Sequence, residues 1–248
     1  IFAFKEMAKI VDYPLGLQIV TDEEVGGVNG TKYQVSKGVR SDFVLACEPT
    51  NFNIVYKAKG VLQVKISSKG KTFHGAYPWM GENAIEKMNK FINILQKKLP
   101  NPKTEKWVTT VNTSKIETTN QTFNKIPDDC TLWLDIRYVA EDAETILKKV
   151  KSLLPKGFKL EISGVGLPVD TKESDENILK LSKIVKQQTG INVVLRGANG
   201  TSDVSHFVSV NCPGIEFGPI GGGIGSDKEW VDISSLEIYY KILKEFLR

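Results

Sequence analysis

The sequence predicts an α/β fold in which a mixed-sheet domain is interrupted by a ferredoxin-like α+β domain. Short apolar runs typical of buried strands alternate with helical patterns up to about residue 56, and again from residue 169. Between them, residues 57–168 carry the order strand, helix, strand, strand, helix, strand, which is the split βαβ pattern. We therefore expect one domain from residues 1–56 and 169–248, and a second domain inserted at residues 57–168.

The composition limits the classes of partner. With 248 residues, of which 41% are hydrophobic, the chain can bury a sizeable core. The net charge of +4 is dispersed along helical patterns, and no basic motif is interleaved with aromatic residues, so we expect no nucleic-acid partner. No apolar run approaches the roughly 20 residues of a membrane-spanning helix, so we expect no membrane partner.

The cysteines indicate the compartment. Cys47, Cys130 and Cys212 are far apart, odd in number and set in apolar, strand-like contexts. These features are typical of buried free thiols in a reducing compartment. The first residues also lack the layout of a signal peptide, so we expect the protein in the cytoplasm.

The first domain is expected to open inside a helix at Phe2–Ile10. No capping residue precedes this pattern, so we expect an upstream part of the protein to be missing. Buried strands at Leu17–Val20 and Val44–Thr50 then flank a short helix at Thr31–Val35 in a βαβ-type arrangement. The domain continues with a helix at Asn177–Gln188, strands at Val193–Arg196 and Gly214–Pro219, a flexible loop at Gly221–Gly225, and a helix at Ser234–Leu247 capped by Ser234 or Ser235.

The inserted domain is expected to contain four strands and two helices. Its first helix has apolar residues three and four apart, as an amphipathic helix requires, and two prolines end it. In chain order the elements are the strand Gly60–Ser67, the helix Asn83–Leu95, the strands Trp107–Ile116 and Cys130–Arg137, the helix Glu144–Leu154 and the strand Phe158–Ile162.

Two adjacent carboxylates, Glu23 and Glu24, follow the first expected strand. Neighbouring side chains on an extended backbone point in different directions, so one carboxylate can bind a metal while the other faces a water on that metal. The alternative is a solvated acidic turn closed by Gly26 and Gly27. Glu48 lies at the end of the next expected strand, and the ends of strands in an open α/β sheet gather at one edge, where ligands bind.

Six motifs then occur in a fixed order along nearly the whole chain. They are Thr21–Gly27, Cys47–Thr50, Gly70–Pro78 with Gly81–Ile85, Asn124–Asp128, Asp135–Arg137 and Gly200–Asp203. Together they resemble the dizinc aminoacylase/carboxypeptidase family of metallopeptidases, which includes glutamate carboxypeptidase, acetylornithine deacetylase and succinyl-diaminopimelate desuccinylase. The resemblance implies a metallopeptidase-like catalytic domain, incomplete at its N-terminus, and an inserted lid domain that forms a homodimer.

The resemblance also implies a reaction and its residues. A metal-bridged water would hydrolyse the amide bond of small N-acyl amino acids or peptides, with Glu23 as the general base. Glu24 and Glu48 would bind the metals, two zinc ions by family pattern, with cobalt or manganese as alternatives. Gly200, Thr201 and Ser202 belong to the expected substrate-binding set.

Three residues of the inserted domain complete the implied site. His74 would reach a neighbouring subunit's active site and stabilise the tetrahedral oxyanion. Its alternative is an ordinary surface histidine after a turn. Asn124 and Arg137 would hold the substrate carbonyl and carboxylate, Arg137 through its bidentate fork. For Arg137 the alternative is a structural pair with Asp135.

The sequence departs from the family pattern at several points. The family's upstream His-x-Asp motif and its bridging Asp are absent, and Gly225 stands where the family has its last histidine ligand. His206, the second of two histidines, is either a ligand or a helix-borne histidine with other partners. Thr118 and Thr119 replace paired glycines ahead of Asn124. A catalytically silent relative that dimerises or binds a ligand is therefore one alternative, and an unrelated α/β binding protein is another.

Overall fold

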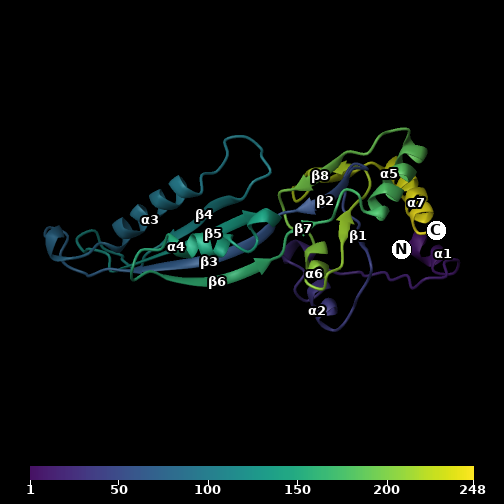
Figure 1. Cartoon of the computed structure of the whole chain (residues 1–248). Coiled ribbons are helices and arrows are strands. Elements are labelled where there is room, and N and C mark those ends of the chain that lie inside the picture. Colours follow the sequence, from purple (N-terminus) through teal and green to yellow (C-terminus); the bar gives the residue numbers. More distant parts are fainter. The chain divides into compact units, whose positions relative to one another are not determined.

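The computed structural model describes all residues from 1 to 248 (Figure 1). The chain forms two compact units. Unit 1 consists of Ile1–Ala58 and Val169–Arg248, and unit 2 of Lys59–Pro168. None of the helices combines the length and the apolar character needed to span a membrane.

Unit 1 is built on a mixed five-stranded sheet. Its strands are β1 (Val44–Ala46), β2 (Ile54–Ala58), β7 (Val169–Asp170), β8 (Leu195–Ala198) and β9 (Gly214–Glu216). They follow the order β1-β9-β2-β7, and β8 also pairs with β2. The pairs β1/β9 and β2/β8 are parallel, whereas β2 is antiparallel to β7 and β9. The mixed sheet expected from the sequence is therefore present.

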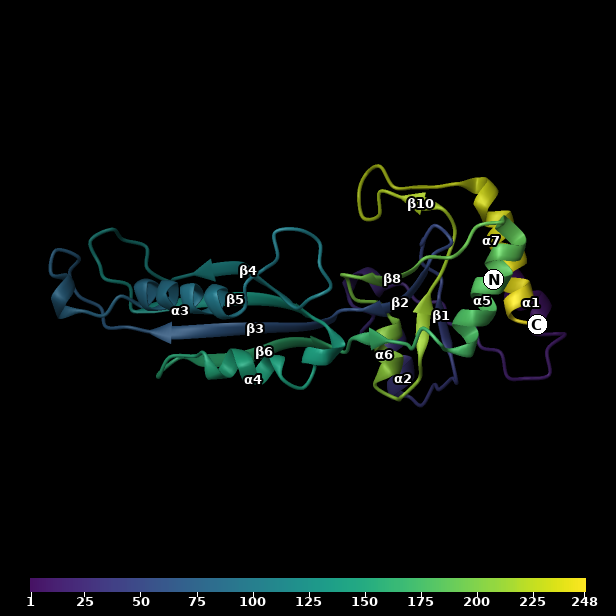
Figure 2. The ribbon, with the colours of Figure 1, turned by 45° about the horizontal axis from the view of Figure 1, so that its top comes forward.

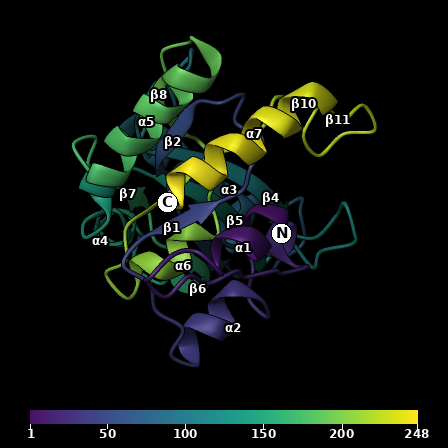
Figure 3. The same cartoon turned by 90° about the vertical axis from the view of Figure 1, so that its right-hand side faces the viewer.

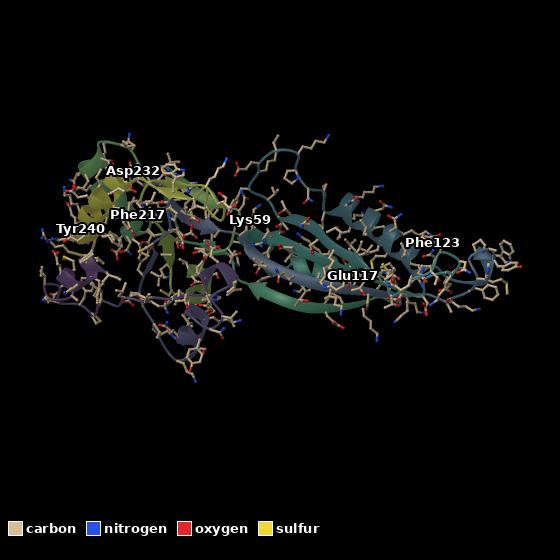
Figure 4. All side chains as sticks on the ribbon, turned by 180° about the vertical axis from the view of Figure 1, so that it is seen from behind. Lys59, Glu117, Phe123, Phe217, Asp232 and Tyr240 are labelled. Carbon is tan, nitrogen blue, oxygen red and sulfur yellow. The ribbon has the colours of Figure 1, made fainter.

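Two long helices, α5 (Glu176–Thr189) and α7 (Ile233–Phe246), pack on this sheet (Figure 3). Their buried side chains form one cluster with Ile54, Ile215 and Phe217 of the sheet region, and burial of each large apolar side chain contributes about 1.5–3 kcal/mol. Phe217, labelled in Figure 4, is fully buried in this unit. The short helices are α1 (Phe2–Met7), which packs on α7, and α2 (Thr31–Ser36) and α6 (Val204–Val208), which pack together.

Unit 2 is a four-stranded antiparallel sheet with helices on one face (Figure 2). Its strands are β3 (Gly60–Lys69), β4 (Thr110–Glu117), β5 (Asp129–Tyr138) and β6 (Lys159–Gly166), in the order β4-β5-β3-β6. Alternate residues of β3 and β5 are buried against α3 (Ala84–Lys98) and α4 (Ile146–Ser152). This is the ferredoxin-like arrangement expected from the order of elements.

The helix α3 begins where the sequence indicates. The side chain of Asn83 accepts hydrogen bonds from the backbone N–H groups of Ile85 and Glu86 at 2.9 and 3.2 Å, as an N-cap does. Three one-turn 3₁₀ helices lie in loops: η1 (Glu23–Val25), η2 (Pro78–Met80) and η3 (Ala140–Asp142).

The predicted strand at Leu17–Val20 is wrong. No strand pairs with this segment, and Leu17 and Ile19 are 43% and 65% exposed. An apolar run forms a buried strand only where a neighbouring strand supplies ladder hydrogen bonds, and none does so here. The βαβ-type arrangement at this point is consequently absent, although the helix α2 within it is confirmed.

Four smaller predictions also differ from the structure. Cys47 is exposed, whereas Cys130 and Cys212 are buried free thiols as expected. The N-cap of α7 is Asp232, whose side chain accepts from the N–H of Ser234, so neither predicted serine is the cap. The sequence analysis predicted no strand at Ile54–Ala58, where the structure has β2. Gly221–Gly222 forms the short strand β10, paired with β11 (Trp230–Val231), so the glycine loop is partly a hairpin.

Candidate active site

The carboxylate pair Glu23 and Glu24 lies on η1 and not on extended backbone. Asp22 shapes this turn: its side chain accepts hydrogen bonds from the N–H groups of Asn29 and Gly30 at 2.7 and 3.0 Å. Gly26 ends the turn with a φ of +96°, a left-handed conformation that glycine adopts without strain. The acidic turn closed by glycines, which the sequence offered as the alternative, is therefore present, and Glu23 lies on it.

Two strand ends bring further carboxylates into unit 1. Glu216 ends β9 and is paired in register with Ala46, the last residue of the parallel strand β1. Glu48 follows Ala46 by two residues. The carboxyl ends of two parallel neighbours thus carry acidic side chains at the same edge of the sheet.

A third group comes from the segment between β8 and α6. Asp203 accepts a hydrogen bond from the hydroxyl of Thr31 at 2.5 Å. The ring of His206 lies with Nε2 at 3.2 Å from the carbonyl oxygen of Gly26 and at 3.6 Å from Asp203 Oδ1. His206 is thus borne on a helix and has partners, which is one of the two interpretations that the sequence left open.

Burial and mutual repulsion raise the pKa of the carboxyls in this group. The pKa of Glu23 is raised to about 7, first by burial and then by the charges of Glu48, Asp203 and Glu24. The pKa of Glu48 is also raised, by burial first and then by Glu216, Glu24 and Asp203. Burial likewise raises the pKa of Glu216, against a hydrogen bond with Ser202 that lowers it. The side chains therefore lie near one another. They are called the acidic group below and comprise Glu23, Glu24, Glu48, Asp203 and Glu216.

The predicted substrate residues of the loop after β8 differ in accessibility. Gly200 is exposed and Thr201 is half-buried. Ser202 is only 5% exposed and makes its hydrogen bond with Glu216. Ser202 therefore orients a carboxylate of the acidic group, and its role toward substrate stays a prediction.

The donor set does not fit a closed zinc site. Such a site takes three or four protein ligands, and no group of three or more His, Cys, Asp or Glu side chains is arranged to hold a metal ion. Glu24 and Glu48 could each offer a carboxylate, but His206 is engaged by Gly26 and Asp203. Gly225 lies exposed in the turn between β10 and β11. The acidic side chains are near enough to repel one another, yet they do not converge as metal ligands.

In unit 2, His74 and Asn124 are brought together. Residues 74 and 125 form an antiparallel bridge, and the N–H of Gly75 donates to the carbonyl oxygen of Asn124 at 2.7 Å. Both side chains are exposed. The Nδ1 atom of His74 accepts from the N–H of Ala76 at 3.1 Å. In the neutral ring the proton then sits on Nε2, which is free to donate.

Arg137 lies at the other end of β5. It follows Asp129, the first residue of that strand, by eight residues, a distance of roughly 26 Å along extended backbone. Its guanidinium forms a bidentate pair with Asp135, with Nε–Oδ1 at 3.0 Å and Nη2–Oδ2 at 3.1 Å. The structural pair that the sequence offered as an alternative is thus formed, and the substrate role of Arg137 stays a prediction.

Comparison with known proteins supports the resemblance found in the sequence. Residues 56–160 match the family described as the peptidase dimerisation domain, M20_dimer. A succinyl-diaminopimelate desuccinylase of Rickettsia bellii is 27% identical over 250 residues, which cover 92% of this chain and 63% of that protein. The desuccinylase of Pelagibacter ubique is 28% identical, over 97% of this chain and 67% of that protein. The chain is therefore similar to M20 peptidases and to desuccinylases, which supports the resemblance of its ordered motifs to the aminoacylase/carboxypeptidase family.

Solved structures of two peptidases show the same fold. Aminopeptidase PepT from Bacillus cereus matches with a TM-score of 0.78 at 19% identity, over 92% of this chain and 62% of PepT. An M20 family metallo-carboxypeptidase from Sulfolobus solfataricus matches with a TM-score of 0.69 at 18% identity, over 91% of this chain and 68% of that enzyme. The predicted fold class is confirmed. The chain spans less than two thirds of the length of the Rickettsia relative.

The sequence analysis did not select two members of the acidic group, Asp203 and Glu216. Asp203 closes the Gly200–Asp203 motif, which was noted only for its substrate role. Glu216 stands at a strand end, like Glu48, so the rule that ligands bind at strand ends could have found it. The hydrogen bond between Ser202 and Glu216 could not be found in this way, because it depends on the packing of α6 against β9.

Proposed function

We propose that the protein is a metal-dependent hydrolase that cleaves the amide bond of small N-acyl amino acids or peptides. The observation that carries this proposal is the pKa of Glu23, raised to about 7 within the acidic group. A carboxylate with a pKa near the working pH is an effective general base. The names of the relatives, desuccinylase and aminopeptidase, support the same reaction class.

Three residues of the chain would act on the reacting atoms. Glu23 takes a proton from the attacking water and delivers it to the leaving nitrogen. His74 donates its Nε2 proton to the oxyanion that forms on the carbonyl carbon, since Nδ1 is occupied by the N–H of Ala76. Asn124, held beside His74, would bind the same carbonyl region.

The geometry of unit 2 supports a homodimer. His74 and Asn124 lie roughly 26 Å or more along β5 from Arg137, farther than a small substrate extends. One copy therefore cannot place all three side chains of unit 2 on one small substrate. Two copies can, if His74 and Asn124 of one subunit complete the site of its partner. The match of residues 56–160 to a dimerisation domain favours this assembly.

Zinc is the proposed metal, with two ions by family pattern and with cobalt or manganese as alternatives. From this chain, Glu24 and Glu48 are the proposed ligands. Two carboxylates are fewer than a closed zinc site needs, so metal binding is the step that an experiment must test first.

A second candidate function follows from the same observation. A catalytically silent member of the family would keep the fold and the dimerisation surface but not hydrolysis. The absence of a metal-holding group, with Gly225 in place of the family histidine, favours it. It predicts a dimer with no bound metal and no turnover.

The deciding experiment combines metal content with turnover. The purified protein is dialysed against micromolar zinc, its metal is measured by elemental mass spectrometry, and hydrolysis of N-acyl amino acids is assayed with Glu23→Gln as the control. The hydrolase predicts two zinc ions per chain and activity that the substitution abolishes. A zinc-free, inactive dimer would reject it in favour of the silent relative. Activity that survives Glu23→Gln would reject the role of Glu23.

A further inference from the structure

Five large apolar side chains are exposed on two loops at one end of unit 2. This aromatic patch consists of Phe73, Tyr77, Trp79, Met80 and Phe123. Trp79 is 74% exposed and Phe123 is fully exposed, at the loop end of the unit (Figure 4). Apolar side chains gathered in this way mark binding sites more often than those scattered singly over a surface.

The rings of the patch contact one another in sequence. The centroids of Phe73 and Tyr77 are 6.1 Å apart and those of Tyr77 and Trp79 are 5.9 Å apart, both in edge-to-face geometry. These are favourable arrangements for aromatic pairs, so the rings present a preformed surface.

The aromatic patch is continuous with the two predicted substrate residues of unit 2. The ring of His74 lies 5.9 Å from that of Tyr77. The N–H of Ile126 donates to the carbonyl oxygen of Phe73 at 2.8 Å, beside the bond between Gly75 and Asn124. Phe123 directly precedes Asn124. The rings of the aromatic patch therefore lie beside both predicted substrate residues.

The cation next to Asn124 is already paired. Lys125, which follows Asn124, forms an ion pair with Asp128 at 3.2 Å. The desuccinylase relatives are named for the removal of a succinyl group, which carries a carboxylate. The patch itself offers apolar rings, which suit an apolar group better than a carboxylate.

We propose that the aromatic patch binds an apolar or aromatic group of the substrate, adjacent to the amide carbonyl that meets His74. The substrate class is then N-acyl amino acids with an aliphatic or aromatic acyl chain, or peptides with an apolar side chain at that position. This inference rests on the proposed function. It adds a preference that separates this protein from a desuccinylase.

The test compares acyl groups on one amino acid. The protein is assayed with the N-acetyl, N-hexanoyl, N-benzoyl and N-succinyl derivatives of the same amino acid. We expect kcat/KM for the hexanoyl and benzoyl derivatives to exceed that for the succinyl derivative at least 10-fold. The changes Trp79→Ala and Phe123→Ala reduce that ratio by raising KM for the apolar derivatives, whereas Ile94→Ala, at an exposed position on α3, leaves it unchanged.

Each contrary result has a different meaning. Hydrolysis with a preference for the succinyl derivative, or a preference that survives both substitutions, would overturn the inference alone. Absence of hydrolysis with every derivative would overturn the proposed function and the inference with it. Dissociation of a dimer by Trp79→Ala or Phe123→Ala, measured by light scattering, would show that a second copy covers the patch and would also overturn the inference.

Discussion

The Nδ1 atom of His74 accepts a hydrogen bond from the backbone N–H of Ala76, 3.1 Å away. This contact fixes the proton of the neutral ring on Nε2. A surface histidine without a role needs no such tautomer, whereas a donor to an oxyanion does.

The first prediction concerns His74. Because an oxyanion forms only in the transition state, His74→Ala should lower kcat by about 10²-fold or more and leave KM nearly unchanged. Steady-state kinetics of the two proteins measures both constants. Asn93→Ala, an exposed change on α3, is the matched control and should retain full activity. A rise in KM with unchanged kcat would instead indicate a role in ground-state binding.

The second prediction concerns the pH dependence of stability. The raised pKa of Glu23, about 7, means that between about pH 4.5 and 7 the folded protein holds a proton that the unfolded chain has lost. The contribution of Glu23 to the free energy of unfolding therefore falls as pH rises through this window. Glu23→Gln removes this contribution, so the variant should be more stable than the wild type at pH 8 and similar to it at pH 4.5.

Urea unfolding of both proteins in the presence of a chelator measures this difference. In Glu23→Gln the free energy of unfolding should fall less steeply with rising pH than in the wild type. Its slope against pH should not vanish, since the pKa values of Glu48 and Glu216 are raised as well. Glu229→Gln, in the exposed β10–β11 turn, is the control and should keep the wild-type slope. Equal slopes for Glu23→Gln and wild type would contradict the burial of Glu23 among carboxylates.

The third prediction concerns Gly218, which lies against the backbone of Glu48. A Cβ atom at residue 218 would stand 2.1 Å from the carbonyl oxygen of Glu48. Gly218→Ala should therefore displace Glu48, lower the free energy of unfolding by about 1–3 kcal/mol and reduce activity. Gly16→Ala, where no atom lies within 4 Å of the new Cβ, should change stability by less than about 0.5 kcal/mol. Thermal unfolding compares the two, and equal effects would refute the proposed contact.

Much of unit 2 follows from its sequence pattern. The apolar residues Met88, Phe91 and Leu95 recur at helical spacing and all are buried in the core of α3 and the sheet. Along β5, Leu132, Leu134 and other alternate residues face the same core. The periodicities of helix and strand differ, so each element could be predicted locally.

Unit 1 was less predictable because its elements depend on distant partners. Leu17–Val20 has the composition of a strand, but no neighbouring strand pairs with it. Conversely, β2 is short and lies at the expected domain boundary, yet it pairs with β7, β8 and β9. The acidic group also depends on distant partners. Glu23 and Glu48 could be named from their motifs, whereas the proximity of Asp203 and Glu216 to them depends on the fold.

The fourth prediction separates the two interpretations of Arg137. Its guanidinium is paired with Asp135. The side chain of Arg137 is 34% exposed and that of Asp135 is 26% exposed, so the pair contributes less than about 1 kcal/mol to folding. If Arg137 binds the substrate carboxylate, that carboxylate competes with Asp135 for the fork. Asp135→Asn should then lower KM several-fold, and Arg137→Lys should raise it about 10-fold, because lysine cannot form the bidentate contact.

A purely structural pair predicts the opposite pattern for Arg137. Both substitutions would then cost the same small amount of stability, and neither would change KM. Measuring KM and the unfolding midpoint for the two variants and the wild type decides between them. A lower KM in Asp135→Asn with an unchanged kcat would indicate that Arg137 binds the substrate. The substitution would then have removed only a competitor for the guanidinium, and no group that acts in the transition state.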